Sequence, residues 1–136
     1  MAGSLSPRLL ANAPHRLMFF VGASNLLLGM LWWTAWLVAA RWQMFAMPQP
    51  SPYAGWLHAY VMQYQMLPSF IFGFLLTVFP KWTGQPDIAR SRYLPVGIGL
   101  FGGQIATLLG ALGWPHGVAL GVLLTLFGWL AGLSAL

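Results

Sequence analysis

Three histidines, His15, His58 and His116, are the side chains of this sequence best suited to chemistry. Cysteine is absent and Asp87 is the single acidic residue, so disulfides, thiolate ligands, paired carboxylates and a Ser-His-Asp triad are all excluded. Imidazole binds both haem iron and copper. Any reaction would therefore belong to a bound cofactor rather than to the side chains themselves.

Methionine gives one of these histidines further possible ligands. His58, Met62 and Met66 are spaced four residues apart and would line one face of an α-helix. Imidazole together with thioethers favours Cu(I), which predicts a copper site on that face. Met44 and Met47 are expected on the same side of the membrane. The alternative is that the methionines only fill gaps in the packing, as flexible apolar side chains often do.

The composition predicts that helices in a membrane position these residues. The chain is 59% hydrophobic and 5% charged, whereas soluble domains carry about 25% charged residues. A helix needs about 20 apolar residues to cross the hydrocarbon, and four stretches of the sequence qualify. The sequence therefore predicts an all-α, integral membrane four-helix bundle. Its exterior would contact the lipid bilayer, other membrane subunits or further copies of the chain, and nucleic acid is not an expected partner. We expect one membrane domain, 1–136, with helices at about 18–40, 55–79, 95–112 and 116–136.

The basic residues predict the orientation of these helices. The N-terminal segment and the second loop hold five of them, and the opposite side holds only Arg41. The positive-inside rule then places both termini in the cytoplasm. On this topology His15 lies inside, while His58 and His116 lie outside, each near the start of a descending helix. They could bind one metal or haem iron together, or each could simply bond water and headgroups at the interface.

Other residues indicate how the helices would pack. Gln63, Gln65 and Tyr60 could support a metal site or form hydrogen bonds between helices, and the structural use is favoured because unpaired polar groups are costly in a membrane. Lys81 could contact a lipid phosphate or a haem propionate. The sequence stops at Leu136 within an apolar run, which suggests a longer parent protein or a neighbouring subunit. Close helix contacts are predicted at glycines four residues apart, namely Gly99 and Gly103, Gly117 and Gly121, and Gly128 and Gly132.

Several short motifs are similar to those of a known family. They are Pro14-His15-Arg16 followed by Phe20, then Trp56 and His58, then Gly73-Phe74-Leu75-Leu76-Thr77 and Pro80-Lys81-Trp82-Thr83-Gly84. Over about 14–84 the chain resembles the N-terminal third of NnrS-family proteins, which are polytopic bacterial membrane proteins. The resemblance implies the bacterial inner membrane, haem b and possibly copper, and a role in the nitric oxide response or in respiratory metalloenzyme function. It carries possible ligand roles to His15 and His58.

The chain also departs from the family pattern. The second helix of the family opens with a histidine-any-histidine-glutamate-methionine motif. Where that motif has its second histidine this chain has Tyr60, and where it has glutamate this chain has Val61. Only His58 and Met62 therefore remain of the motif. The family is also about three times longer. The alternative function is therefore a cofactor-free structural or assembly subunit of a larger membrane electron-transfer complex. Whether the chain is an enzyme stays open.

Overall fold

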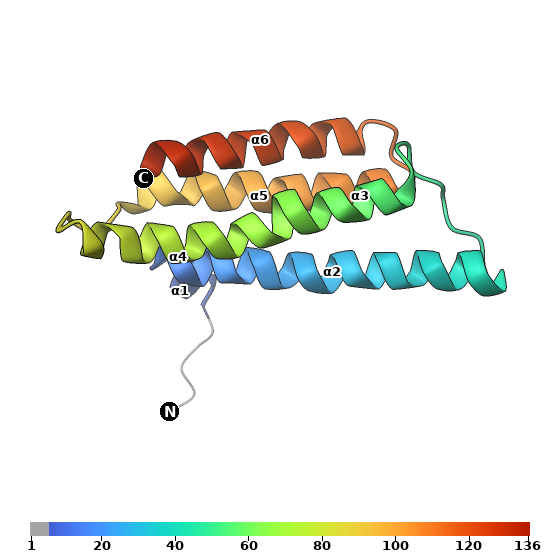
Figure 1. Cartoon of the computed structure of the whole chain (residues 1–136), viewed down its shortest axis with the longest axis horizontal. Helices are drawn as coiled ribbons and strands as arrows, with labels where there is room; N and C mark the ends of the chain where they lie inside the picture. The colour runs from blue at the N-terminus through green and yellow to red at the C-terminus, as the bar shows by residue number, and fades with distance from the viewer. Residues whose placement is uncertain (1–5) are drawn as a thin grey trace, which may run out of the picture.

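Four long apolar helices make up the computed structural model, which describes residues 6–136 (Figure 1). Each of the four is long and apolar enough to cross a membrane. The predicted all-α, multi-pass membrane architecture is thus confirmed. The elements are α1 (Pro7–Leu10), α2 (Pro14–Trp42), α3 (Ala54–Tyr60), the π-helical segment η1 (Val61–Met66), α4 (Leu67–Trp82), α5 (Arg90–Ala111) and α6 (Gly117–Ala135), with α3, η1 and α4 continuous.

The first three long helices are longer than the apolar runs from which they were expected, and the fourth matches its run to within one residue at each end. Helix α2 starts at Pro14, a residue whose fixed φ suits the first helical position. It ends where Gln43 turns into the left-handed region and donates its backbone N–H to the carbonyl of Ala39. Helix α5 starts at Arg90, several residues before the apolar run. Hydropathy misses such first turns because they are helical but polar.

The helices form two antiparallel hairpins that pack against each other. Helix α2 lies along α4, α5 lies along α6, and α2 also contacts α5. The starts of α2 and α5 and the ends of α4 and α6 therefore share one end of the bundle, here called the basic end because it carries Arg16, Lys81, Arg90 and Arg92. The opposite end, here called the far end, contains the starts of α3 and α6 and the ends of α2 and α5.

A proline explains one contact between the hairpins. Pro68 has no N–H to give to the carbonyl of Tyr64, four residues earlier in the helix. That carbonyl instead accepts a hydrogen bond from Trp129 Nε1 on α6, at 2.9 Å. The π-helical segment η1 directly precedes this point, as irregular turns often do where a helix ladder is interrupted. The carbonyl left without a helix partner by Pro68 is thus hydrogen-bonded by a neighbouring helix.

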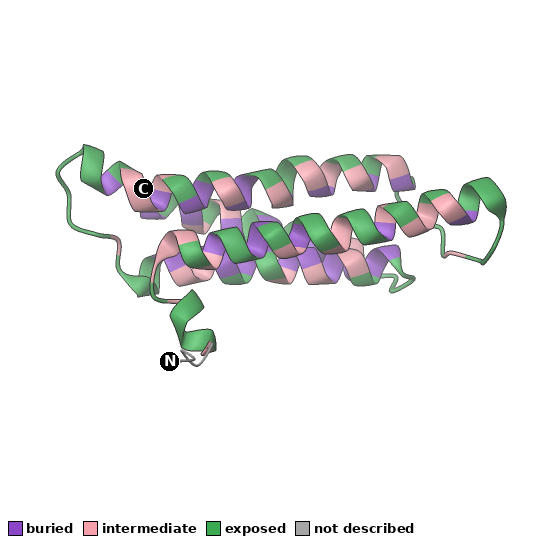
Figure 2. Cartoon of the chain, turned by 90° about the horizontal axis from the view of Figure 1, so that it is seen from below, coloured by how far each residue is buried: buried purple, intermediate pink, exposed green. Residues whose placement is uncertain are grey.

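The interior has apolar clusters at its two ends and a polar layer between them. The cluster toward the basic end is built on Met18, Phe72, Leu76 and Leu100, and the cluster toward the far end on Trp32, Leu57 and Ala111. The outward faces of all four long helices are exposed (Figure 2). These faces carry large apolar side chains, among them Leu27, Leu31, Leu123 and Leu130. Such an exterior suits lipid or other membrane helices rather than water.

Candidate functional site

His58 lies in an aromatic cluster at the far end. Its ring stacks on Trp33 of α2 with centroids 4.5 Å apart and planes 4° apart, and Trp33 stacks in turn on Trp36 at 5.4 Å. Indole rings span the space between α2 and α3 at this end. His58 Nδ1 is buried and has no hydrogen-bond partner among residues 6–136. The same holds for Nε1 of Trp36 and the hydroxyl of Tyr60. This end therefore contains several polar atoms without a described partner, including one imidazole nitrogen.

The two methionines that follow His58 are both partly buried. Met62 packs toward α2, where its Cε lies 3.3 Å from the position that a Cβ would take at Gly29. His58 and Met62 therefore both face α2, one turn apart. Met66 closes the π-helical segment η1. The wider turns of η1 change the angle between Met62 and Met66 from the α-helical value on which a single stripe was predicted.

The second histidine of the far end, His116, is exposed. His116 is the residue before the first turn of α6, and no side-chain capping bond is formed there. His58 and His116 thus belong to the same end of the bundle, but one ring is stacked against α2 and the other is exposed. Within residues 6–136 no group of three histidine, cysteine or acidic side chains could hold a metal ion. A shared ligand role for these two histidines stays a prediction.

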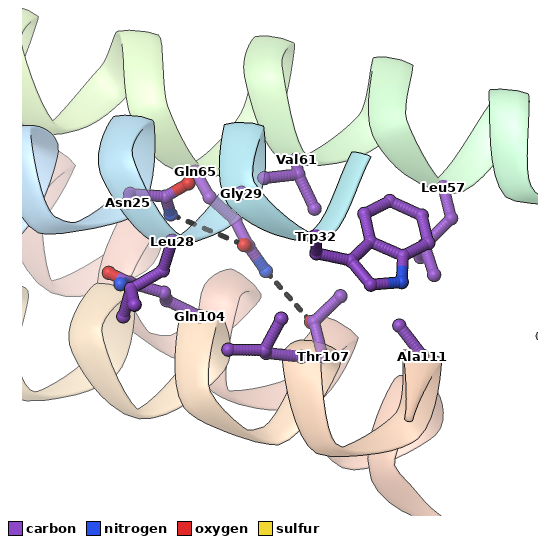
Figure 3. A pocket seen from close by; sticks show the side chains of 11 residues that line it. Asn25, Leu28, Gly29, Trp32, Leu57, Val61, Gln65, Gln104, Thr107 and Ala111 are labelled. Atoms are coloured by element: carbon purple, nitrogen blue, oxygen red, sulfur yellow. Dashed lines mark hydrogen bonds between the residues drawn. The ribbon is translucent and has the colours of Figure 1, made fainter. Parts of the chain in front are cut away.

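A polar layer crosses the middle of the bundle (Figure 3). Gln65 is fully buried, and its Nε2 donates to Thr107 Oγ1 at 2.9 Å and to Thr125 Oγ1 at 3.1 Å. Its Oε1 accepts a hydrogen bond from Asn25 Nδ2 at 3.4 Å. One amide thereby joins α2, η1, α5 and α6. The structural use expected for Gln65 accords with these bonds, whereas Gln63 is exposed.

Two further residues of this layer, Asn25 and Gln104, were not among the residues singled out from the sequence. Both are buried, and Asn25 Oδ1 and Gln104 Nε2 have no partner among the described residues. A cavity that leaves about 20 Å³ for the centres of water-sized molecules lies beside them, with Leu28 and Gly29 in its wall. The sequence did carry a signal for these two residues, because each is a polar residue inside an otherwise apolar span, Asn25 in α2 and Gln104 in α5. Such residues are rare and usually face the bundle interior.

His15 lies at the basic end, where its hydrogen bonding fixes which ring nitrogen carries a proton. Thr77 Oγ1 donates its single hydrogen to the carbonyl of Gly73 at 2.8 Å. The 3.4 Å contact between His15 Nδ1 and Thr77 Oγ1 therefore has the imidazole as donor. In the neutral ring this leaves Nε2 as an acceptor. The same arrangement, with one ring nitrogen held by an oxygen, orients histidines that bind metals.

His15 lines a pocket of about 360 Å³ at this end, between α2, α4 and α5. Arg90 holds one wall, because its Nε donates to the carbonyl of Ala11 at 2.8 Å and its Nη2 to Asn12 Oδ1 at 2.5 Å. The hydroxyl of Tyr93 donates to the same carbonyl of Ala11 at 2.6 Å. The segment before α2 is thus tied to the start of α5.

Together these features define a polytopic membrane protein with a polar interior layer, one imidazole at the basic end and two at the far end. The model of the NnrS protein family matches residues 9–136, nearly the whole chain. The chain therefore belongs to the NnrS family. The match extends through α5 and α6, beyond the range of about 14–84 over which the motifs suggested it. No curated protein and no solved structure matches the chain.

Proposed function

We propose that this NnrS-family chain binds a metal cofactor, haem b or copper, through His58 at the far end. Its role would be in the nitric oxide response or in respiratory metalloenzyme function of the bacterial inner membrane. The observation that carries the proposal is the buried Nδ1 of His58, which has no partner among residues 6–136. A buried polar atom left unpaired costs about 1–3 kcal/mol, and a bond to a metal would remove that cost.

The surroundings of His58 suit a metal ligand. Stacking on Trp33 holds the ring in one orientation, and a fixed imidazole loses less entropy on binding than a free one. Met62, one turn away, would add a thioether for copper, and His116 is the proposed second ligand for haem. Bound iron or copper would supply the redox chemistry that the side chains lack. The chain's own residues would hold the metal and keep it within the bundle.

The proposed orientation follows from the charges at the two ends. Arg16, Lys81, Arg90 and Arg92 lie at the basic end, and Arg41 is the basic residue at the far end. The positive-inside rule favours a cytoplasmic basic end, with both termini in the cytoplasm and His58 near the outer face. Labelling of single cysteines introduced at the basic end or the far end, from either side of oriented membranes, would check this orientation.

Absorption spectroscopy of the full chain, purified in detergent from haem-replete cells, tests the cofactor. We expect a Soret band that is lost in His58→Ala and weakened in His116→Ala. His15→Ala should keep the band, because His15 lies at the opposite end. Elemental analysis of the same samples reports copper. A colourless protein without copper, or a Soret band that His58→Ala leaves unchanged, would contradict the proposal.

A second candidate function is a cofactor-free structural or assembly subunit. The apolar outer face of α6 favours it, with Leu123 64% and Leu130 58% exposed. Tyr60 and Val61, in place of the family's histidine and glutamate, agree with a lost cofactor site. This function predicts a colourless chain that co-purifies with a larger membrane complex. Mutating Leu123 and Leu130 to alanine should then weaken the co-purification, whereas cofactor binding at His58 would be unaffected by the same change.

A further inference from the structure

The pocket at the basic end collects positive charge from two helix ends. Lys81 stands in the last turn of α4 and Arg90 at the first residue of α5, and both line the pocket beside His15. Asp87 is the one acidic residue in the wall. Two cationic side chains against one carboxylate leave the pocket positive even when His15 is neutral. The pocket therefore suits an anion.

The positive charge of Arg90 is held in place without being neutralised by its hydrogen-bond partners. It donates to the carbonyl of Ala11 and the side-chain oxygen of Asn12, and both acceptors are uncharged. These bonds fix the guanidinium at the pocket wall, so little side-chain entropy is left to lose when an anion binds.

The position of the pocket indicates what kind of anion it meets. It lies where α2 and α5 begin and α4 ends, so it is at the level where these apolar helices leave the hydrocarbon. Trp82, next to Lys81, is 70% exposed, and tryptophan is favoured at the membrane interface. Leu76, Ile88 and Tyr93 give the pocket an apolar part. A ligand with an anionic head and acyl chains satisfies both the charged and the apolar walls.

We propose that this pocket binds the phosphate headgroup of an anionic phospholipid from the leaflet at the basic end. Basic pockets between membrane helices commonly take such headgroups. The site is separate from the proposed metal site, which lies at the far end. The group that the pocket would recognise is a phosphate, which a free phosphate ion also carries. The lipid is favoured because the pocket opens at the headgroup level.

Native mass spectrometry of the full chain in detergent tests the proposal, with phosphatidylglycerol as the probe and phosphatidylcholine for comparison. We expect adducts with phosphatidylglycerol at lower lipid concentration than with phosphatidylcholine. One basic side chain near a membrane surface changes the affinity for an anionic lipid about fivefold. Lys81→Gln and Arg90→Gln should therefore each weaken the adduct by about this factor. Arg16→Gln is the matched control, because Arg16 is an exposed cation at the same end that does not line the pocket.

The outcomes separate the sources of the phosphate. Inorganic phosphate at matched concentration should leave the lipid adduct in place, and if it displaces the lipid, the free ion is the ligand and the proposal fails. Equal binding of the two lipids, or equal effects of Lys81→Gln and Arg16→Gln, would also overturn it. Arg90→Gln also removes the hydrogen bonds to Ala11 and Asn12 that tie the segment before α2 to α5. The proposal is therefore judged on Lys81→Gln.

Discussion

The seam between α5 and α6 depends on glycine at positions where two backbones meet. A Cβ added at Gly99 would lie 2.6 Å from both Cα and N of Gly128 and 2.9 Å from the carbonyl oxygen of Leu124. All three are backbone atoms, which cannot move aside as the end of a flexible side chain can. We therefore expect Gly99→Ala to push the two helices apart.

The size of the effect follows from two opposing terms. Overpacking costs about 1–3 kcal/mol, and replacing glycine by alanine within a helix gains up to about 1 kcal/mol. Gly102→Ala is the matched control on the same helix, since its Cβ would meet only Leu124 Cδ1, at 3.3 Å. The propensity gain is common to both variants and cancels in their difference. Gly99→Ala should be less stable than Gly102→Ala by about 1–3 kcal/mol, the overpacking cost alone.

Reversible unfolding in mixed detergent micelles, followed by circular dichroism, gives this difference as a free energy of unfolding. The two variants should differ in stability but keep the helical content of the wild type in the folded state. Equal stability of Gly99→Ala and Gly102→Ala would refute the reasoning, because it would mean that the α5–α6 seam tolerates a methyl group between its backbones.

Two further predictions concern the polar layer and the copper site. Gln65→Leu removes three interhelical hydrogen bonds, each worth about 0.6 kcal/mol in a membrane, so it should lower the free energy of unfolding by about 2 kcal/mol. The exposed Gln63→Leu should change it by less than about 0.5 kcal/mol, and comparable losses in both would argue against the network. Met62→Leu keeps the side-chain volume but removes the thioether, so it should lower copper content, measured by elemental analysis, as His58→Ala does. Copper unchanged in Met62→Leu would remove Met62 from the site.

The number and type of the helices could be predicted because hydropathy reports directly on length and solvent. The glycines Gly99, Gly103, Gly117, Gly121 and Gly128 do lie in the α5–α6 seam, but Gly132 faces Phe72 of α4 instead. Spacing alone gives the face of a helix and not its partner. The link from Trp129 to Tyr64 was also beyond prediction, because it depends on a carbonyl freed by Pro68 lying next to a particular indole of α6. Such pairings arise only when the helices are packed.

The antiparallel register of α2 against α3 and α4 limits what the two family-matched histidines can do. His15 contacts Thr77, and Trp33 of the same helix contacts His58. His15 and Trp33 are 18 residues apart in α2, which at 1.5 Å per residue is about 27 Å. One metal ion cannot bond both imidazoles across that distance. If both histidines are functional, they serve different sites, which is why a loss of metal in His58→Ala but not in His15→Ala is the informative pattern.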